Sequence, residues 1–289
     1  MDYQGNVIRP PSEANSIILQ VTVGCSHNRC TFCGAYKGER FRFKDPATID
    51  TDIDYAASHY QRHSRLFLAD GDVLITPQHR LVPLLEKIRT RLPRVRRISL
   101  YGNCKSIGHK TLNDLVELKA LGLDRIYMGL ESGDDGVLST ICKGSTSEQM
   151  IDSARKVRES GIFLSVTILL GIGGVESSAR HAINTAKVLN QMALNQIAAL
   201  TVMPIPGTSL HDDILHGRFQ MLDKIGILNE LKTLVQHIEL DKVQFQANHA
   251  SNFLPIDCRL SRDKAATLSR IDQALAGNIP LMPDYMRGL

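Results

Sequence analysis

The chain has 289 residues, of which 43% are hydrophobic and 22% are charged, and its formal net charge is +4. These values suit one large globular domain, such as an α/β barrel, or a two-domain protein. The longest apolar stretch, residues 162–175, is interrupted by Ser165, Thr167 and glycines. It is shorter than the roughly 20 residues of a membrane helix, so we expect no membrane span.

The N-terminal residues 1–15 are polar and lack the basic and apolar leader of a secretory signal. The six cysteines show no paired extracellular spacing, so we expect reduced thiols and a cytoplasmic protein. A basic run between Arg89 and Arg97 has no interleaved aromatic residues. This pattern indicates a solvated helix end, and we expect no nucleic-acid partner.

Short apolar or β-branched runs alternate with helical patterns at the spacing of βαβ units, roughly 30 residues. The predicted strands are 17–23, 65–69, 97–101, 125–130, 162–170 and 197–202. Strands connected in this way pair in parallel, with right-handed crossovers.

The predicted helices carry their own start signals. A helix that begins at Thr76-Pro77 must kink or restart at Pro83, because proline lacks the helical N–H. Residues 112–121 form the next helix. The pair Ser145 and Glu148 forms a capping box that starts another.

The C-terminal part is less regular, with predicted elements at 219–238 (helix), 242–246 (strand) and 263–275 (helix). No linker rich in Gly, Pro or Ser divides the chain. We therefore predict an α/β fold, a partial (β/α)6-type TIM barrel with parallel strands plus a C-terminal extension. The expected parts, within one domain, are an N-terminal segment 1–15, the barrel 16–208, and an extension that closes the barrel, 209–289.

A polar or glycine-rich segment follows each of the six predicted strands, where a parallel barrel collects its chemistry. These segments are Cys25–Cys33, Asp70–Asp72, Gly102–Cys104, Glu131–Gly133, Gly171–Glu176 and Met203–Thr208. Any strand-to-helix turn favours glycines and acids, so a helix-capping role remains open for Asp70, Asp72, Glu131 and Glu176. Taken together, the six segments indicate one site on one rim.

Three cysteines, Cys25, Cys30 and Cys33, follow the first predicted strand. Three thiolates can hold a metal or a cluster and leave one position open, which is the usual mark of a catalytic site. Together with His27 they could instead supply the four ligands of a structural zinc knuckle. Zinc sites, however, usually take their second ligand pair from a separate turn.

With the order of segments from Ser16 to Thr208, this motif resembles the radical S-adenosylmethionine (radical SAM) superfamily. In that superfamily three cysteines after the first strand of a partial barrel hold a [4Fe-4S] cluster, and an aromatic residue, here Phe32, usually precedes the last one. Four residues instead of the usual three separate Cys25 from Cys30, which makes a CX4CX2C variant. The chain is also similar to the radical SAM proteins related to anaerobic coproporphyrinogen oxidase.

The resemblance implies an enzyme that uses a reduced [4Fe-4S] cluster to cleave S-adenosylmethionine. The resulting 5'-deoxyadenosyl radical would abstract hydrogen from a substrate. The resemblance also implies an electron donor such as flavodoxin or ferredoxin. The substrate, a small molecule or a group bound to a carrier protein, stays unassigned.

The resemblance further assigns the rim residues to S-adenosylmethionine. Asp70, Gly71 and Asp72 lie where the superfamily binds the methionine amine, and Glu131 and Ser132 would contact the ribose hydroxyls or the methionine end. In the glycine-rich turn the backbone can approach the adenine closely. The other cofactor-binding candidates are Asn103, Gly171, Gly173, Glu176 and Met203.

Several residues keep two interpretations. Cys104, Cys142 and Cys258 could hold a second cluster, as in the sulfur-inserting lipoyl and biotin synthases, or could be ordinary core thiols. Lys143 is a candidate partner for a substrate or methionine carboxylate, or a surface lysine. His249 is a candidate proton carrier at the barrel mouth, or part of a hydrogen-bonded turn. A non-enzymatic zinc or iron-sulfur binding module is the alternative from a different class.

Overall fold

The computed structural model describes residues 1–288. Its strands are β1 (Ile17–Gln20), β2 (Thr22–Val23), β3 (Arg42–Phe43), β4 (Arg65–Ala69), β5 (Arg97–Tyr101), β6 (Leu123–Glu131), β7 (Phe163–Leu170), β8 (Gln196–Thr201), β9 (Val243–Gln246) and β10 (Asp257–Leu260). Its α-helices are α1 (Pro46–His59), α2 (Gln78–Arg91), α3 (Cys104–Gly108), α4 (Leu112–Ala120), α5 (Asp135–Thr140), α6 (Ser147–Glu159), α7 (Gly174–Gln191), α8 (Ser209–Leu215), α9 (Lys224–His237) and α10 (Lys264–Leu275). Within residues 1–288, no helix is both long and apolar enough to cross a membrane.

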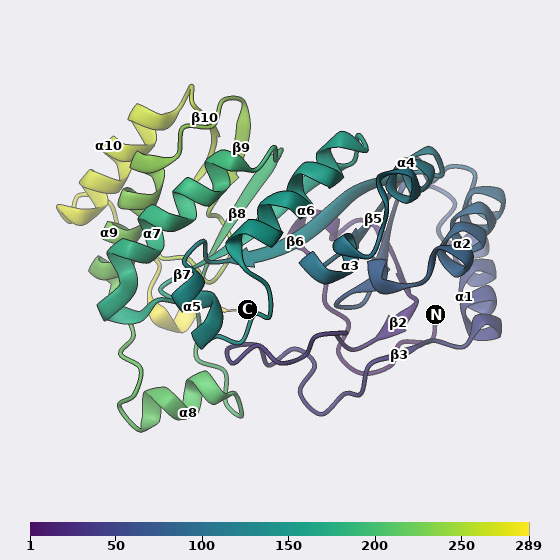
Figure 1. The fold of residues 1–289 in the computed structure, drawn as a ribbon, viewed down its shortest axis with the longest axis horizontal. Helices are drawn as coiled ribbons and strands as arrows, with labels where there is room; N and C mark the ends of the chain where they lie inside the picture. The colour runs from purple at the N-terminus through teal and green to yellow at the C-terminus, as the bar shows by residue number, and fades with distance from the viewer. Residues whose placement is uncertain (289) are drawn as a thin grey trace. The chain divides into compact units, whose positions relative to one another are not determined.

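The main sheet has eight strands in the order β1-β4-β5-β6-β7-β8-β9-β10, and a small second sheet pairs β2 with β3 (Figure 1). β1 pairs in parallel with β4, β4 with β5, β5 with β6, β7 with β8, and β8 with β9. β10 runs antiparallel to β9. The prediction of an α/β fold with a mostly parallel sheet, of the partial-barrel type, is confirmed.

The described residues divide into two compact units. Unit 1 comprises Met1–Asn28, Ala35–Met128 and Arg155–Leu164. Unit 2 comprises Arg29–Gly34, Gly129–Ala154 and the chain from Ser165 onward. The division into 1–15, 16–208 and 209–289 stays a prediction.

In unit 1 the two faces of the parallel strands carry different side chains, because successive residues of a strand point to opposite faces. Leu66 and Leu68 are fully buried on one face. On the other face Phe67, Tyr101 and Tyr127 pack edge to face, with ring centroids 5.2 to 6.1 Å apart. This aromatic cluster joins three neighbouring strands and favours their observed register.

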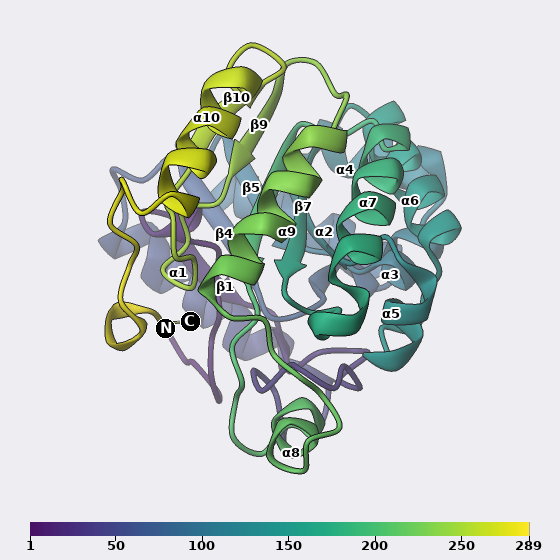
Figure 2. The same cartoon turned by 90° about the vertical axis from the view of Figure 1, so that its left-hand side faces the viewer.

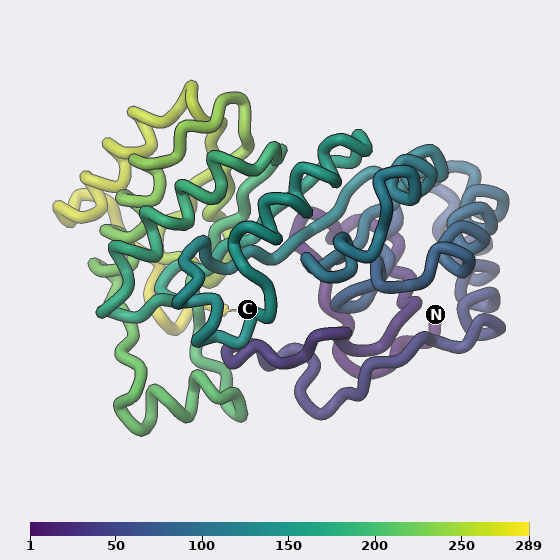
Figure 3. The backbone as a smooth tube through the Cα atoms, viewed as in Figure 1, coloured from purple at the N-terminus to yellow at the C-terminus, as the bar shows by residue number. Residues whose placement is uncertain are grey.

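In unit 2, α9 packs against both α7 and α10, and Figure 2 shows the three helices side by side. One face of β8 and β9 buries apolar side chains such as Ile197 and Phe245. The opposite face of β9 carries Gln244 and Gln246, and Gln246 Nε2 donates to Asp257 Oδ2 at 2.9 Å. Figure 3 shows that the segment around α8 extends away from the three helices.

Two elements in the first hundred residues differ from the sequence-based prediction. The strand predicted at 17–23 is divided at Val21, whose N–H donates to the Ala69 carbonyl while its own carbonyl accepts from the Lys44 N–H. The residues after Val21 leave β1 and pair with β3. α2 runs from Gln78 to Arg91 with Pro83 inside it, so the helix does not restart there. An interior proline removes one backbone hydrogen bond and crowds the preceding turn, and the kink at Pro83 stays a prediction.

The predicted capping box of α6 is wrong by one position. Thr146, rather than Ser145, caps the helix, because its Oγ1 accepts the Gln149 N–H at 3.3 Å. Gln149 Oε1 accepts the Thr146 N–H at 3.1 Å in return. Gln serves the motif as well as Glu, so two overlapping candidates were present in the sequence.

Gly133 provides a test of the packing between the end of β6 and α7. A Cβ at Gly133 would lie 2.6 Å from the carbonyl oxygen of Asn184 and 2.6 Å from the Cα of Thr185. These are backbone atoms that cannot rotate away, so Gly133→Ala is expected to lower the free energy of unfolding by about 1–3 kcal/mol. Urea denaturation followed by circular dichroism measures the change.

The matched control is Gly108→Ala, at the last position of α3. No atom lies within 4 Å of a Cβ there, and alanine favours a helix by up to about 1 kcal/mol over glycine. Equal denaturation midpoints for the two variants would contradict the packing at Gly133.

Candidate functional site

In unit 1, Asp70 fixes the start of the cysteine-containing loop. Its Oδ2 accepts the Gly24 N–H at 3.1 Å and Gln20 Nε2 at 3.0 Å, and its Oδ1 accepts the Tyr36 hydroxyl at 3.1 Å. The side chain is fully buried, and burial raises the pKa of the Asp70 carboxyl. Because a buried carboxyl group needs donors around its oxygens, these bonds hold the backbone beside Cys25 in place.

Asp72 holds the opposite side of Cys25. Its Oδ2 accepts Ser26 Oγ at 2.5 Å and Asn103 Nδ2 at 2.7 Å, and its Oδ1 accepts the Asn103 N–H at 3.3 Å. Burial raises the pKa of the Asp72 carboxyl as well. The structure therefore brings Asp70, Asp72 and Asn103 together around the Cys25 loop, with both carboxyl groups bonded to donors of the chain itself.

Gly71 lies between these two acids and against the same loop. A Cβ at this position would be 2.7 Å from the Tyr36 ring and 3.0 Å from the Cβ of Cys25. The close approach explains why the residue between Asp70 and Asp72 carries no side chain.

In unit 2, Cys30 and Cys33 lie at the two ends of one turn. The Cys33 N–H donates to the Cys30 carbonyl at 3.3 Å. Between them Thr31 donates its N–H to the Ile141 carbonyl at 3.0 Å and accepts the Leu210 N–H at 3.0 Å. The turn is thus attached on both sides to segments of unit 2, and Phe32 within it is partly exposed.

The ligand set fits an iron-sulfur cluster by its chemistry. Thiolates are the ligands of [4Fe-4S] clusters, and two of the three cysteines share one anchored turn. Within residues 1–288, no group of three or more Cys, His, Asp or Glu side chains forms an assembled site for a single metal ion.

Glu131 and Lys143 form an ion pair in unit 2. Lys143 Nζ lies 2.8 Å from Glu131 Oε1, and both side chains are largely buried. The pair crosses Gly129, where a Cβ would lie 2.9 Å from Lys143 Nζ and even closer to the Glu131 carboxylate. Gly129, a glycine inside a strand, marks in the sequence a place where other atoms approach the backbone closely.

Ser132 belongs to a buried polar network that the sequence analysis missed. Its Oγ lies 2.8 Å from Nδ1 of His181, and Nε2 of His181 lies 3.6 Å from Oε1 of Glu230. Glu230 also accepts the N–H of Gly171 at 2.6 Å. A lone acid among the apolar residues of α9 is the signal that could have indicated Glu230.

Other predicted residues lie apart from these contacts. Glu176 is exposed in the first turn of α7, where an acid favours the helix N-terminus. Met203 is partly buried after β8, and Gly173 precedes α7.

His249 Nδ1 bonds to the hydroxyl and the N–H of Ser251 at 2.9 and 3.1 Å, as in a hydrogen-bonded turn. Burial lowers the pKa of His249.

The three remaining cysteines occupy different environments. Cys104 is buried in unit 1, whereas in unit 2 Cys142 is exposed and Cys258 is buried. Burial raises the pKa of the Cys258 thiol, which opposes the thiolate that a cluster needs.

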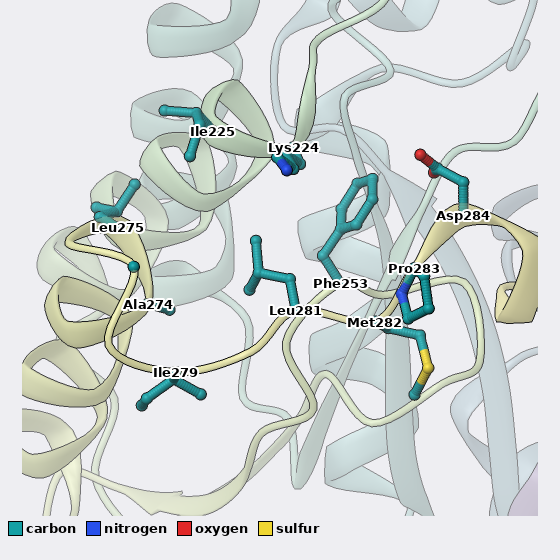
Figure 4. Close-up of a pocket in the computed structure, with 11 residues that line it drawn as sticks. Lys224, Ile225, Phe253, Ala274, Leu275, Ile279, Leu281, Met282, Pro283 and Asp284 are labelled. Carbon is teal, nitrogen blue, oxygen red and sulfur yellow. The ribbon is translucent and has the colours of Figure 1, made fainter.

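Unit 2 also contains a cavity of about 490 Å³ near the C-terminus (Figure 4). Figure 4 shows Phe253, Leu281 and Met282 at this cavity, with Lys224 and Asp284 as its charged residues. Its lining includes none of the predicted site residues, so we do not assign it to the site.

Curated relatives and solved structures resemble this chain over part of their length. It is 26% identical over 174 residues to 4'-phospho-dehydrooxetanocin synthase of Priestia megaterium, a match covering 54% of this chain and 23% of the relative. It is 27% identical over 128 residues to biotin synthase of a Sulfurihydrogenibium species, covering 44% and 37%. The chain thus spans well under two thirds of these relatives.

The structure of coproporphyrinogen III oxidase from Escherichia coli, described as a radical SAM enzyme, is similar to this fold. Its TM-score is 0.55 at 15% identity, over 76% of this chain and 52% of that one. At this identity the likeness concerns the fold alone.

A sequence profile of the Radical SAM superfamily matches residues 19–186, more than half of the chain. The matched region contains the three cysteines, both aspartates after β4, the Glu131 and Lys143 pair and the glycine-rich turn. The chain therefore belongs to the Radical SAM superfamily.

Proposed function

We propose that Cys25, Cys30 and Cys33 are the ligands of the [4Fe-4S] cluster that the superfamily implies. The observation that carries this proposal is the anchoring of the three cysteines. Asp70 accepts the Gly24 N–H before Cys25, Asp72 accepts the Ser26 hydroxyl after it, and the Thr31 backbone holds the turn between the other two cysteines. When bound and reduced, the cluster supplies the electron that cleaves S-adenosylmethionine to methionine and the 5'-deoxyadenosyl radical.

The methionine end of S-adenosylmethionine carries an ammonium and a carboxylate, and the Glu131–Lys143 pair offers one counter-charge for each. We propose that Lys143 binds the carboxylate and Glu131 the amine. The largely buried pair at 2.8 Å supports this role, because desolvated charges bind counter-charges more strongly than exposed ones. The predicted contact of Asp70 and Asp72 with the amine stays a prediction.

The remaining cofactor contacts are proposals of the same kind. The turn from Gly171 to Glu176, which includes Gly173, would support the adenine, and the backbone near Met203 would meet the adenine edge. Ser132 would contact the ribose. Phe32 and Asn103 would border the cluster loop. Glycine permits the close backbone approach that a flat base requires.

The substrate, a small molecule or a carrier-bound group, remains unassigned. We retain four further expectations as proposals. They are membership of the coproporphyrinogen oxidase-like group, the functional equivalence of the CX4CX2C spacing, a flavodoxin or ferredoxin as reductant, and a cytoplasmic location. His249 is retained as a candidate for proton transfer to or from the substrate.

Sulfur insertion is the second candidate function. It is favoured by the likeness to biotin synthase, and it would require Cys104, Cys142 and Cys258 to hold an auxiliary cluster. The non-enzymatic alternative is set aside because the chain belongs to an enzyme superfamily.

Iron content and product release test the ligand assignment. In anaerobically reconstituted protein, Cys25→Ser, Cys30→Ser and Cys33→Ser are each expected to lose the cluster and to abolish release of 5'-deoxyadenosine under reduction. The triple variant of Cys104, Cys142 and Cys258 to Ser should keep about four irons per chain and full S-adenosylmethionine cleavage. About eight irons in the wild type, falling to four in the triple variant, would contradict the single-cluster assignment and support sulfur insertion.

Gly71→Ala tests the contact between the β4 turn and the cysteine loop. The added methyl group meets the Tyr36 ring and Cys25, so we expect iron incorporation to fall several-fold while the far-ultraviolet circular dichroism stays unchanged. Gly108→Ala serves as the control. Wild-type iron content in Gly71→Ala would refute the proposed geometry of the loop.

Lys143→Ala tests the carboxylate contact. Loss of a charge-assisted hydrogen bond is expected to raise KM for S-adenosylmethionine roughly ten-fold, with the cluster retained. Lys187→Ala, at an exposed position of α7, should leave KM unchanged. An unchanged KM in Lys143→Ala would remove Lys143 from the site.

A further inference from the structure

Glu230 is a buried acid in the middle of α9 whose carboxylate is fully used within unit 2. Its exposed fraction is 2%. Oε1 accepts the Gly171 N–H at 2.6 Å and Oε2 accepts the Ser178 hydroxyl at 2.6 Å. One carboxylate therefore binds both the first residue of the glycine-rich turn and the second turn of α7.

The Gly171 N–H needs such an anchor because the turn cannot be fixed by a side chain of its own. Gly171 has a φ of +82°, and a Cβ there would lie 2.7 Å from Ile227 Cδ1 of α9. Glycine lets α9 approach the turn closely, and Glu230 on the same helix then determines where the turn lies.

His181 extends the same network to the end of β6. Its Nδ1 lies 2.8 Å from Ser132 Oγ and its Nε2 lies 3.6 Å from Glu230 Oε1. Burial lowers the pKa of His181 to about 4, so the imidazole is neutral at pH 7 and the pair with Glu230 is not an ion pair. A hydrogen bond with the backbone of Leu169 completes the contacts of the ring.

Such an arrangement is costly for folding, because a buried carboxylate without a cationic partner is strongly desolvated. A neutral glutamine or an apolar residue would fill the same space at lower cost. The presence of an acid is explained if its charge is needed for the bond to Gly171, since a carboxylate accepts an N–H bond more strongly than a neutral carboxyl group.

We propose that Glu230 is a positioning residue that holds the turn of residues 171–174 in the conformation that receives the adenosine part of S-adenosylmethionine, and that its ionised form performs this role. This inference rests on the proposed function, in which that turn supports the adenine. It adds a residue from outside the region matched to the superfamily, which ends at residue 186.

The groups that face Glu230 allow it to titrate near neutral pH. On α7 these are Ser178 and the neutral His181, and at the end of β7 the Gly171 N–H. The cation of α9 nearest in sequence, Lys232, is paired at 2.5 Å with Asp272 of α10. Burial raises the pKa of Glu230 from 4.5 to about 7, against the opposing effect of the Ser178 and Gly171 bonds.

Two pH effects of opposite sign follow. Because the pKa of Glu230 is raised by folding, its contribution to folding stability is fully present below pH 4.5 and is lost as the pH rises through about 7. Binding of the nucleoside should instead strengthen over the same interval, because the ionised form accumulates. A residue with a purely structural role would not produce opposite trends.

The experiment uses 5'-methylthioadenosine as the probe, in calorimetric titrations of the reconstituted holoenzyme between pH 6 and pH 8.5. This nucleoside lacks the amino acid part of S-adenosylmethionine, so the probe itself does not titrate in that interval. We expect the wild-type Kd to fall about five-fold from pH 6 to pH 8.5. We expect Glu230→Gln to bind about five-fold more weakly than wild type at pH 8.5, with no dependence on pH.

Glu239→Gln, an exposed position beyond the end of α9, is the control and should follow the wild type. Thermal unfolding of the same proteins should show a midpoint that falls with rising pH more steeply in the wild type than in Glu230→Gln. The wild-type pH profiles test the inference even if the variant folds poorly.

Binding that is independent of pH, or equal in wild type and Glu230→Gln, would overturn the inference and leave the proposed function intact. Binding by none of the three proteins at any pH would overturn the proposed adenosine site together with the inference. The two failures are thus distinguishable.

Discussion

Buried carboxyl groups that must find hydrogen-bond donors are the constraint on which the site depends. An acid removed from water is tolerated only where donors surround it. After β4 this requirement draws Gly24, Ser26 and Asn103 to Asp70 and Asp72. The loop that carries Cys25 is therefore held by two side chains that directly follow β4.

The same principle operates in unit 2 with different residues. Glu131 is satisfied by Lys143, and Glu230 by a backbone N–H and a hydroxyl. Asp70, Asp72 and Glu230 each bond to a segment that has just left a strand, where the backbone needs new partners. Burial of these acids costs free energy of folding, and in return each of these loops adopts one defined conformation.

Much of the fold could be predicted from the sequence. β4 and β5 have the predicted bounds, because short apolar runs between polar turns leave little choice of element. α1, β3 and β10 were not indicated. β3 has only two residues, and β10 forms an edge where period-two alternation is brief, so neither gives a signal above that of a loop.

The site was predictable where its chemistry is local. The three cysteines and the acids after β4 lie close in sequence to the strands that present them. Glu230 and His181 were missed because their roles depend on contacts between segments about 50 to 60 residues apart. The lone acid in the apolar pattern of α9 marks Glu230 as unusual, but a helical pattern does not tell which distant backbone N–H such an acid binds.

The central claim is that three thiolates hold the cluster and leave one iron for S-adenosylmethionine. Electron paramagnetic resonance of the reduced, reconstituted protein tests it directly, because the signal of a [4Fe-4S] cluster responds to a new ligand on its iron. We predict that addition of S-adenosylmethionine changes the spectrum of the wild-type protein. A full-strength cluster signal that stays identical with and without S-adenosylmethionine would contradict the open position and the account built on it.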